Sequence, residues 1–180
     1  MEDEKELNSN LGKRILIIGS SGAGKSTFSI QLSKIINIPI IHLDKEYWKS
    51  GWVKPEKDEW NNKINDLLNK EEWIMDGNFK STLDIRLSKA DTCIFLDYNR
   101  LICLFRIFKR GLFGYKNKRI DMAEGCVEKL PEISFIKFVW DYPKKSRPQI
   151  IEKMEKHKNV NKIILKNDKE ADFFMKRLGK

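Results

Sequence analysis

The chain has 180 residues, and its 35 Lys+Arg against 26 Asp+Glu give a formal net charge of +9. This length is typical of one domain, and 41% hydrophobic with 34% charged residues exclude a disordered chain. No apolar run approaches the ~20 residues of a membrane span. The acidic start indicates neither a secretory signal nor a transit peptide, so we expect a cytoplasmic protein with no membrane contact.

Alternating strands and helices predict an α/β protein with a parallel sheet. After a polar tail at 1–12, a single domain at 13–180 begins with the apolar run 14–18, which is typical of a strand buried on both faces. Further strands are predicted at 38–42, 73–75, 92–96 and 160–165. Helices are predicted at 26–36, 55–69, 99–110, 130–141, 147–158 and 169–178. Residues 43–54 and 111–125 are expected to be irregular.

Residues 19–26, GSSGAGKS, match the phosphate-binding pattern G-x-x-x-x-G-K-[ST] between the first strand and its helix. Glycines let successive backbone N–H groups converge on phosphate oxygens, and the helix presents its positive N-terminus to the same anion. Lys25 is expected to reach the β- and γ-phosphates and Ser26 to bind Mg²⁺. We therefore predict ATP and Mg²⁺ as cofactors. The predicted nucleotide-binding residues are Gly19, Ser20, Ser21, Gly22, Ala23, Gly24, Lys25, Ser26, Thr27 and Arg106.

Aspartates follow three of the predicted strands, at the sheet edge where doubly wound proteins bind ligands. Asp76 is expected to hold Mg²⁺ opposite Ser26, the alternative being a solvated turn residue. Asp44 can accept a hydrogen bond from a substrate hydroxyl or remove its proton, the alternative being a helix cap or solvated loop. Asp97 begins the turn into a basic helix and is as well explained as a cap.

Residues 98–119 contain seven basic residues and no acidic one. Arg106 and Arg110 are four residues apart and share a helix face, and Gly111 and Gly114 follow as a plausible hinge. Such arginines, delivered by a closing lid, stabilise the charge of a phosphoryl group in transfer. A nucleic-acid patch or a solvated basic face are the alternatives.

With these motifs, the chain resembles the adenylate-kinase-like P-loop kinases, and more closely the group labelled DNA topology modulation proteins. The more specific matches are the Trp-x-x-Asp-Gly-Asn segment at 73–78 and Gly125-Cys126 with Glu128. The resemblance implies a three-layer α/β/α P-loop fold with a five-stranded parallel sheet in the order 2-3-1-4-5. It also implies a mobile lid at about 111–128, with arginines at Arg106, Arg110 and Arg147.

The resemblance further implies adenine near 166–167 and an acceptor pocket between residues 43 and 86. The arginine by which adenylate kinases grip the AMP phosphate is absent from its place, and Arg86 or Lys80 is expected to substitute. We expect Asp44, Asn78, Arg86 and Arg147 to contact the acceptor, and Lys25, Arg106, Arg110 and Asp44 to act in catalysis.

The predicted function is an ATP-dependent kinase of a nucleotide or other small molecule. The alternative is an NTP-binding regulator associated with DNA, with little kinase activity. Nucleic acid is the less favoured partner because no DNA-reading motif is recognised in the sequence.

Overall fold

The computed structural model describes residues 11–113, 121–126 and 130–179. Its centre is a five-stranded sheet in the order β2-β3-β1-β4-β5, in which all neighbouring strands are parallel. The strands are β1 (Arg14–Gly19), β2 (Ile40–His42), β3 (Trp73–Asp76), β4 (Thr92–Leu96) and β5 (Asn161–Leu165). The predicted fold class and strand order are thus confirmed.

Two hydrophobic cores lie on opposite faces of this sheet, because successive residues of a strand point to opposite sides. In β1, Ile15 and Ile17 belong to one core, while Leu16 and Ile18 belong to the other. Strand β1 is buried on both of its faces, which explains why its sequence is an unbroken apolar run rather than an alternating one.

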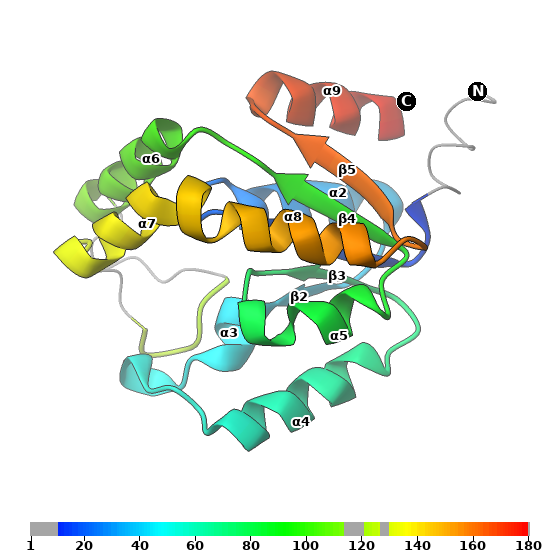
Figure 1. Cartoon of the computed structure of the whole chain (residues 1–180), viewed down its shortest axis with the longest axis horizontal. Helices are drawn as coiled ribbons and strands as arrows, with labels where there is room; N and C mark the ends of the chain where they lie inside the picture. The colour runs from blue at the N-terminus through cyan, green and yellow to red at the C-terminus, as the bar shows by residue number, and fades with distance from the viewer. Residues whose placement is uncertain (1–10, 114–120, 127–129, 180) are drawn as a thin grey trace.

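Helices cover each face and complete three layers (Figure 1). The first core takes residues from α2 (Lys25–Ile36), α6 (Arg100–Phe113), α7 (Ile133–Lys145) and α9 (Asp168–Leu178). The second core takes residues from α4 (Lys57–Leu68), α5 (Leu83–Leu87) and α8 (Arg147–Lys156), and Tyr142 of α7 joins it. Because all strands point the same way, the segments that follow them meet at one edge of the sheet.

Three short segments differ from the expected structure. Residues 43–54, expected to be irregular, contain α3 (Leu43–Tyr47) and the 3₁₀ turn η1 (Ser50–Trp52). A second 3₁₀ turn, η2 (Lys80–Thr82), and α5 were not predicted at all. Helices this short contain too few apolar positions to show the 3.6-residue period by which a helix is predicted, and their stability comes from tertiary packing.

The observed boundaries of the domain and of the lid region also differ from the expected ones. Leu11 is buried and its carbonyl accepts a hydrogen bond from Thr92 Oγ1 at 2.6 Å, so this residue of the predicted tail 1–12 packs against the domain. Helix α6 continues to Phe113, past the expected start of the lid. Of the predicted lid, residues 114–120 and 127–129 lie outside the described residues, as do residues 1–10 of the tail.

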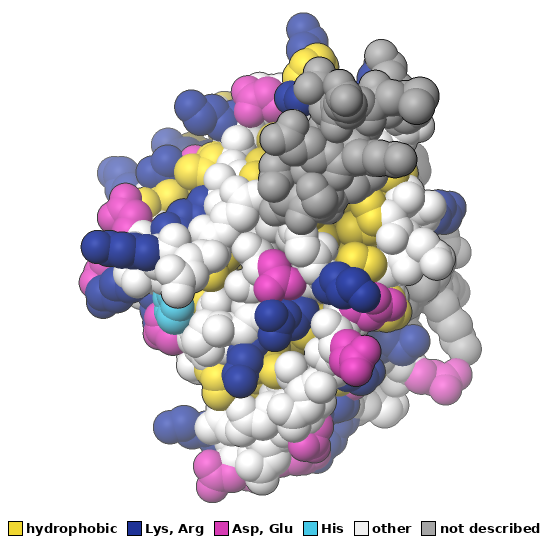
Figure 2. Space-filling view, turned by 90° about the vertical axis from the view of Figure 1, so that its right-hand side faces the viewer, with side chains coloured by type: hydrophobic (Ala, Val, Ile, Leu, Met, Phe, Trp, Pro, Cys, Tyr) yellow, Lys and Arg dark blue, Asp and Glu magenta, His cyan; other side chains and the backbone are white. Residues whose placement is uncertain are grey.

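The surface is mixed in charge on the face that Figure 2 shows, where Lys and Arg side chains lie among Asp and Glu side chains. The excess positive charge does not gather into one patch on this face. Within the described residues, no helix combines the length and apolar character needed to cross a membrane.

Candidate functional site

The loop between β1 and α2 has the backbone geometry that the phosphate-binding pattern predicts. Gly22 has φ +80°, and a Cβ placed on it would collide with the carbonyl of Cys103 in α6. Glycine is therefore required here both by conformation and by the close approach of another helix. The Lys25 ammonium folds back over the loop and donates to the Ser20 carbonyl at 3.1 Å.

Lys25 lies partly buried between the loop and two of the predicted acids. Burial lowers its pKa, while the negative charges of Asp44 and Asp76 oppose that shift. The positive charge of Arg110 adds to the lowering. The charges of Asp44, Asp76 and Arg110, all predicted site residues, thus act on Lys25.

Asp76 is buried at the end of β3, beside the phosphate loop. Its carboxylate accepts a hydrogen bond from Ser29 Oγ at 3.2 Å and lies 3.0 Å from His42 Nδ1. Burial acts to lower the pKa of His42, but the hydrogen bond and charge of Asp76 outweigh it and raise that pKa. Asp76 is therefore a firmly positioned carboxylate rather than a solvated turn residue.

Ser26, the predicted magnesium ligand, donates a hydrogen bond to Asp121 Oδ2 at 2.6 Å. Asp121 is buried, and its negative charge also acts to raise the pKa of His42. Hydroxyl and carboxylate oxygens are the hard ligands that Mg²⁺ prefers, and one or two carboxylates with phosphate oxygens suffice. The Ser26 hydroxyl and the carboxylates of Asp76 and Asp121 are of the chemical type that fits Mg²⁺. Among the described residues, no group of three or more His, Cys, Asp or Glu side chains forms a metal site without such phosphate oxygens.

Asp121 belongs to a segment, residues 121–126, that reaches across the site to the turn η1, as Figure 1 shows. Gly125 has φ +83° and lies so close to Ser50 that a Cβ would collide with its hydroxyl. The Cys126 thiol donates to the Lys49 carbonyl at 3.4 Å. Asp121 was not predicted from the sequence, because no local pattern shows that a residue 95 positions away will form a hydrogen bond with Ser26.

A cavity of about 240 Å³ adjoins the phosphate loop. Asp44 and Trp48 from α3 and its end, and Asn78 and Phe79 after β3, line it together with Ser21 and Lys25. Phe138 of α7 also lines it and was not predicted. The Asn78 side chain accepts a hydrogen bond from the Gly19 amide at 3.0 Å, which ties the cavity to the loop. Asp44 and Asn78, both expected to contact the acceptor, therefore share one cavity with Lys25.

Arg86 does not reach this cavity, contrary to its expected role in binding the acceptor. It is completely buried, and its guanidinium donates to the carbonyls of Gly77, Asn78 and Phe79 at 2.6–3.0 Å. Burial lowers the pKa of Arg86 to about 10, so it remains charged at neutral pH. The physical reason is that the turn after β3 leaves three buried carbonyls that need a donor.

The other predicted arginines also have partners within the chain. Arg147 pairs with Asp97, its Nε lying 2.9 Å from both carboxylate oxygens, and is thus held at the end of β4. Arg106 pairs with Asp168 at 2.6 Å and lies 3.5 Å from the Ala23 carbonyl, beside the phosphate loop and the start of α9. This places Arg106 near the predicted adenine region rather than beside the acceptor cavity.

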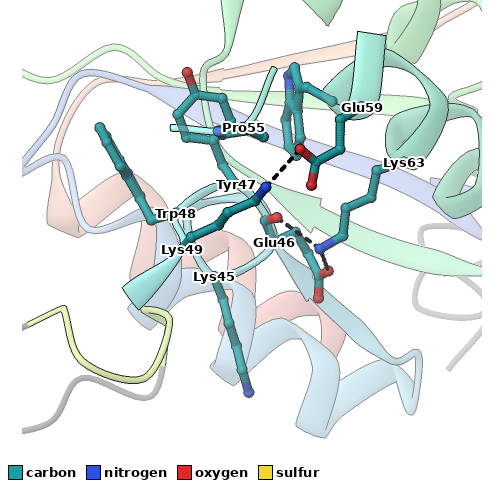
Figure 3. A pocket seen from close by; sticks show the side chains of 9 residues that line it. Lys45, Glu46, Tyr47, Trp48, Lys49, Pro55, Glu59 and Lys63 are labelled. Atoms are coloured by element: carbon teal, nitrogen blue, oxygen red, sulfur yellow. Dashed lines mark hydrogen bonds and ion pairs between the residues drawn. The ribbon is translucent and has the colours of Figure 1, made fainter. Parts of the chain in front are cut away.

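A smaller cavity of about 100 Å³ is also lined by Trp48 (Figure 3). Its rim carries two ion pairs, Lys49–Glu59 at 2.7 Å and Lys63–Glu46 at 2.8 Å. These pairs link α4 to α3 and the residues after it, and so fix the segment that carries Asp44 and Trp48.

Comparison with known proteins gives one related sequence of limited extent. No family model matches the chain. A Bacillus subtilis protein described as uncharacterized protein YqaC is 34% identical over 110 residues, which are 59% of this chain. The chain spans 61% of the length of that relative.

Solved structures of several kinases share the fold at low sequence identity. Shikimate kinase from Acinetobacter baumannii matches with a TM-score of 0.63 at 16% identity, over 94% of this chain and 92% of that one. A gluconokinase from Sinorhizobium meliloti has a TM-score of 0.52 at 14% identity, over 94% of each chain. Deoxyadenosine kinase from M. mycoides has a TM-score of 0.52 at 15% identity, over 92% of this chain and 99% of that one. The chain therefore has the fold of the P-loop small-molecule kinases.

Proposed function

We propose that the protein is an ATP-dependent phosphotransferase that acts on a nucleotide or another small molecule. The observation that carries this proposal is the shared cavity, in which Lys25 and Ser21 of the phosphate loop and Asp44 line the same space. A donor phosphate on the loop and an acceptor in the cavity would therefore be adjacent. Positioning and charge stabilisation supply most of the rate enhancement in phosphoryl transfer.

In the transfer step, the acceptor oxygen forms a bond to the γ-phosphorus of ATP. The bond from that phosphorus to the β–γ bridging oxygen breaks, and ADP leaves with the electron pair. For a hydroxyl acceptor, the Asp44 carboxylate accepts the proton. Lys25 and the loop amides hold the phosphates, and Arg110 adds positive charge beside Lys25.

Ser26 and Asp76 are the proposed holders of Mg²⁺, and Asp121 lies where it can join them. When bound, the ion would offset the negative charge of the phosphate groups. Asp76 is kept in place for this role by Ser29 and His42.

Replacement of Lys25 by alanine tests the proposal directly. We expect Lys25→Ala to lose at least about 100-fold in ATP-dependent turnover, because a preorganised charge beside the transferring group is removed. Turnover is measured as ADP release over a panel of small acceptors, and circular dichroism verifies the fold. Lys34→Ala on the exposed side of the same helix is the matched control and should retain full turnover. Equal turnover in both variants would contradict the proposal.

A further inference from the structure

We propose that the acceptor is an uncharged hydroxyl compound with a flat ring, of the nucleoside class, rather than a monophosphate or a carboxylate. This inference rests on the proposed function and specifies its acceptor. It is carried by three properties of the 240 Å³ cavity: its aromatic lining, the fixed position of Phe79, and the sign of the charges that face it.

Three aromatic side chains line the cavity, Trp48, Phe79 and Phe138. Phe79 is supported from behind, since its ring lies 4.6 Å from that of Tyr47 and 5.0 Å from that of Trp60. Trp48 is likewise packed edge-on against Tyr47 at 5.1 Å. Rings that are held in this way offer flat surfaces on which a heterocycle can stack at little entropic cost.

The backbone of Phe79 is strained, with φ +22° and ψ +74°. A non-glycine residue keeps such a conformation only where its surroundings enforce it, and such residues cluster at binding sites. Here Arg86 enforces it, because its guanidinium holds the Phe79 carbonyl at 3.0 Å and the Asn78 carbonyl at 2.6 Å. The buried arginine is thus a positioning residue that presents the Phe79 ring to the cavity.

The charges at the cavity disfavour an anionic acceptor. Among the described lining residues, Lys25 is the single cation, and the proposed function assigns it to the phosphates of ATP. Arg86 and Arg147, which could have received a phosphate or carboxylate, are occupied by backbone carbonyls and by Asp97. Asp44 adds a carboxylate that would repel a second anion but accept a hydrogen bond from a hydroxyl.

The size of the cavity agrees with a small neutral acceptor. At about 240 Å³ it lies below the ~300 Å³ at which the range for drug-sized ligands begins. In the reaction, the hydroxyl oxygen bonds to the γ-phosphorus, its proton passes to Asp44, and ADP leaves with the electrons of the broken bond. The product is a monophosphate, whose new charge beside Asp44 favours release.

The test compares adenosine, guanosine, cytidine and thymidine with their own 5′-monophosphates, and with gluconate as a carboxylated polyol. We expect ATP-dependent phosphorylation of at least one nucleoside, at least about tenfold more efficient in kcat/KM than that of its monophosphate. Preference for a monophosphate or for gluconate would overturn the inference and leave the proposed function standing.

Two variants test the aromatic contact itself. Trp48→Leu should raise the KM for the nucleoside by about five- to 100-fold, with a much smaller change in kcat, because stacking holds the ring and not the reacting oxygen. Trp140→Leu removes a tryptophan that lies outside the lining of the cavity and should leave both constants unchanged. Equal effects of the two variants would contradict stacking at Trp48.

Binding is measured separately, so that the two proposals can fail independently. Calorimetric titration with ATP alone tests the donor site, and titration with each nucleoside in the presence of a non-hydrolysable ATP analogue tests the acceptor cavity. Absence of ATP binding overturns the proposed function. Binding of ATP without binding of any nucleoside overturns only the inference about the acceptor.

Discussion

The loop of residues 19–26 takes its shape from its own backbone, whereas the acceptor cavity is lined by side chains from three further segments that are distant in sequence. In the loop, positive φ angles and the space around Gly22 determine the geometry. In the cavity, Asp44, Phe79 and Phe138 are brought together by the sheet and by α7. The geometry of the donor side can therefore be predicted from a short stretch of sequence, whereas that of the acceptor side depends on long-range packing.

The largest expected effect is on the acceptor side. Arg86→Met removes a buried charge and leaves the carbonyls of Gly77, Asn78 and Phe79 without donors, which should cost about 3–5 kcal/mol of unfolding free energy. Chemical denaturation measures this loss. Arg14→Met, at a half-exposed ion pair with Asp91, is the matched control and should cost at most about 1 kcal/mol.

Arg86→Lys extends this test to binding, because it keeps the charge with fewer donors. The variant should bind ATP with unchanged affinity while the KM for the acceptor rises, since the turn that carries Phe79 is released. If Arg86→Lys lost affinity for ATP as well as for the acceptor, the proposal that the two sides of the site are shaped independently would be contradicted.

The donor side was predictable from sequence because its chemistry is carried by consecutive residues. The loop and α2 needed only a pattern of glycines between an apolar run and a helix. The five strands were likewise predictable from short apolar runs, whereas their order was expected from the resemblance to adenylate-kinase-like P-loop kinases. Asp44 was predicted from its position after a strand and Asn78 from the family resemblance, and both line the cavity.

The partners of Arg86 and Arg147 were not predicted, because local patterns do not show which distant residues the fold brings together. The sequence shows that Arg86 is basic, but not that its guanidinium will donate to three carbonyls of the turn after β3 and to the Thr82 hydroxyl. Arg147 pairs with Asp97, 50 positions away in the sequence, and Asp121 accepts a hydrogen bond from Ser26, 95 positions away. Such pairs depend on which segments the fold places together, and this cannot be predicted from the local pattern of apolar and polar residues.

An intermediate effect is expected in the phosphate loop. Gly22→Ala forces a side chain into a positive φ and against the Cys103 carbonyl, which should cost about 2 kcal/mol or more and strongly weaken ATP binding. Gly51→Ala is a matched control, because Gly51 has φ +75° but no atom lies within 4 Å of its Cβ position. It should cost only about 1 kcal/mol and leave ATP affinity intact. Equal loss of affinity in both variants would contradict a specific role of Gly22 and its close contact with α6 in ATP binding.

The smallest expected effect lies at the opposite edge of the sheet, where Asp91 precedes β4. Its carboxylate accepts hydrogen bonds from the backbone N–H groups of Lys13 and Arg14 and from the Arg14 guanidinium, at 2.8–2.9 Å. Burial acts to raise the pKa of Asp91, but these bonds outweigh it and lower that pKa. The folded protein therefore favours the ionised form more than the unfolded chain does.

The stabilisation from Asp91 is thus present above the unfolded pKa of about 3.9 and is lost as pH falls through the lower folded value. Asp91→Asn should reduce the unfolding free energy by about 1–2 kcal/mol at pH 7, and the difference from the original protein should shrink below about pH 4. Denaturation from pH 7 to pH 3 measures it, with Asp66→Asn at an exposed position of α4 as control. Neither variant should change ATP or acceptor binding, because this edge lies away from both sides of the site. A difference that grows in acid would mean that the folded protein favours the protonated carboxyl, the opposite of what its hydrogen bonds imply.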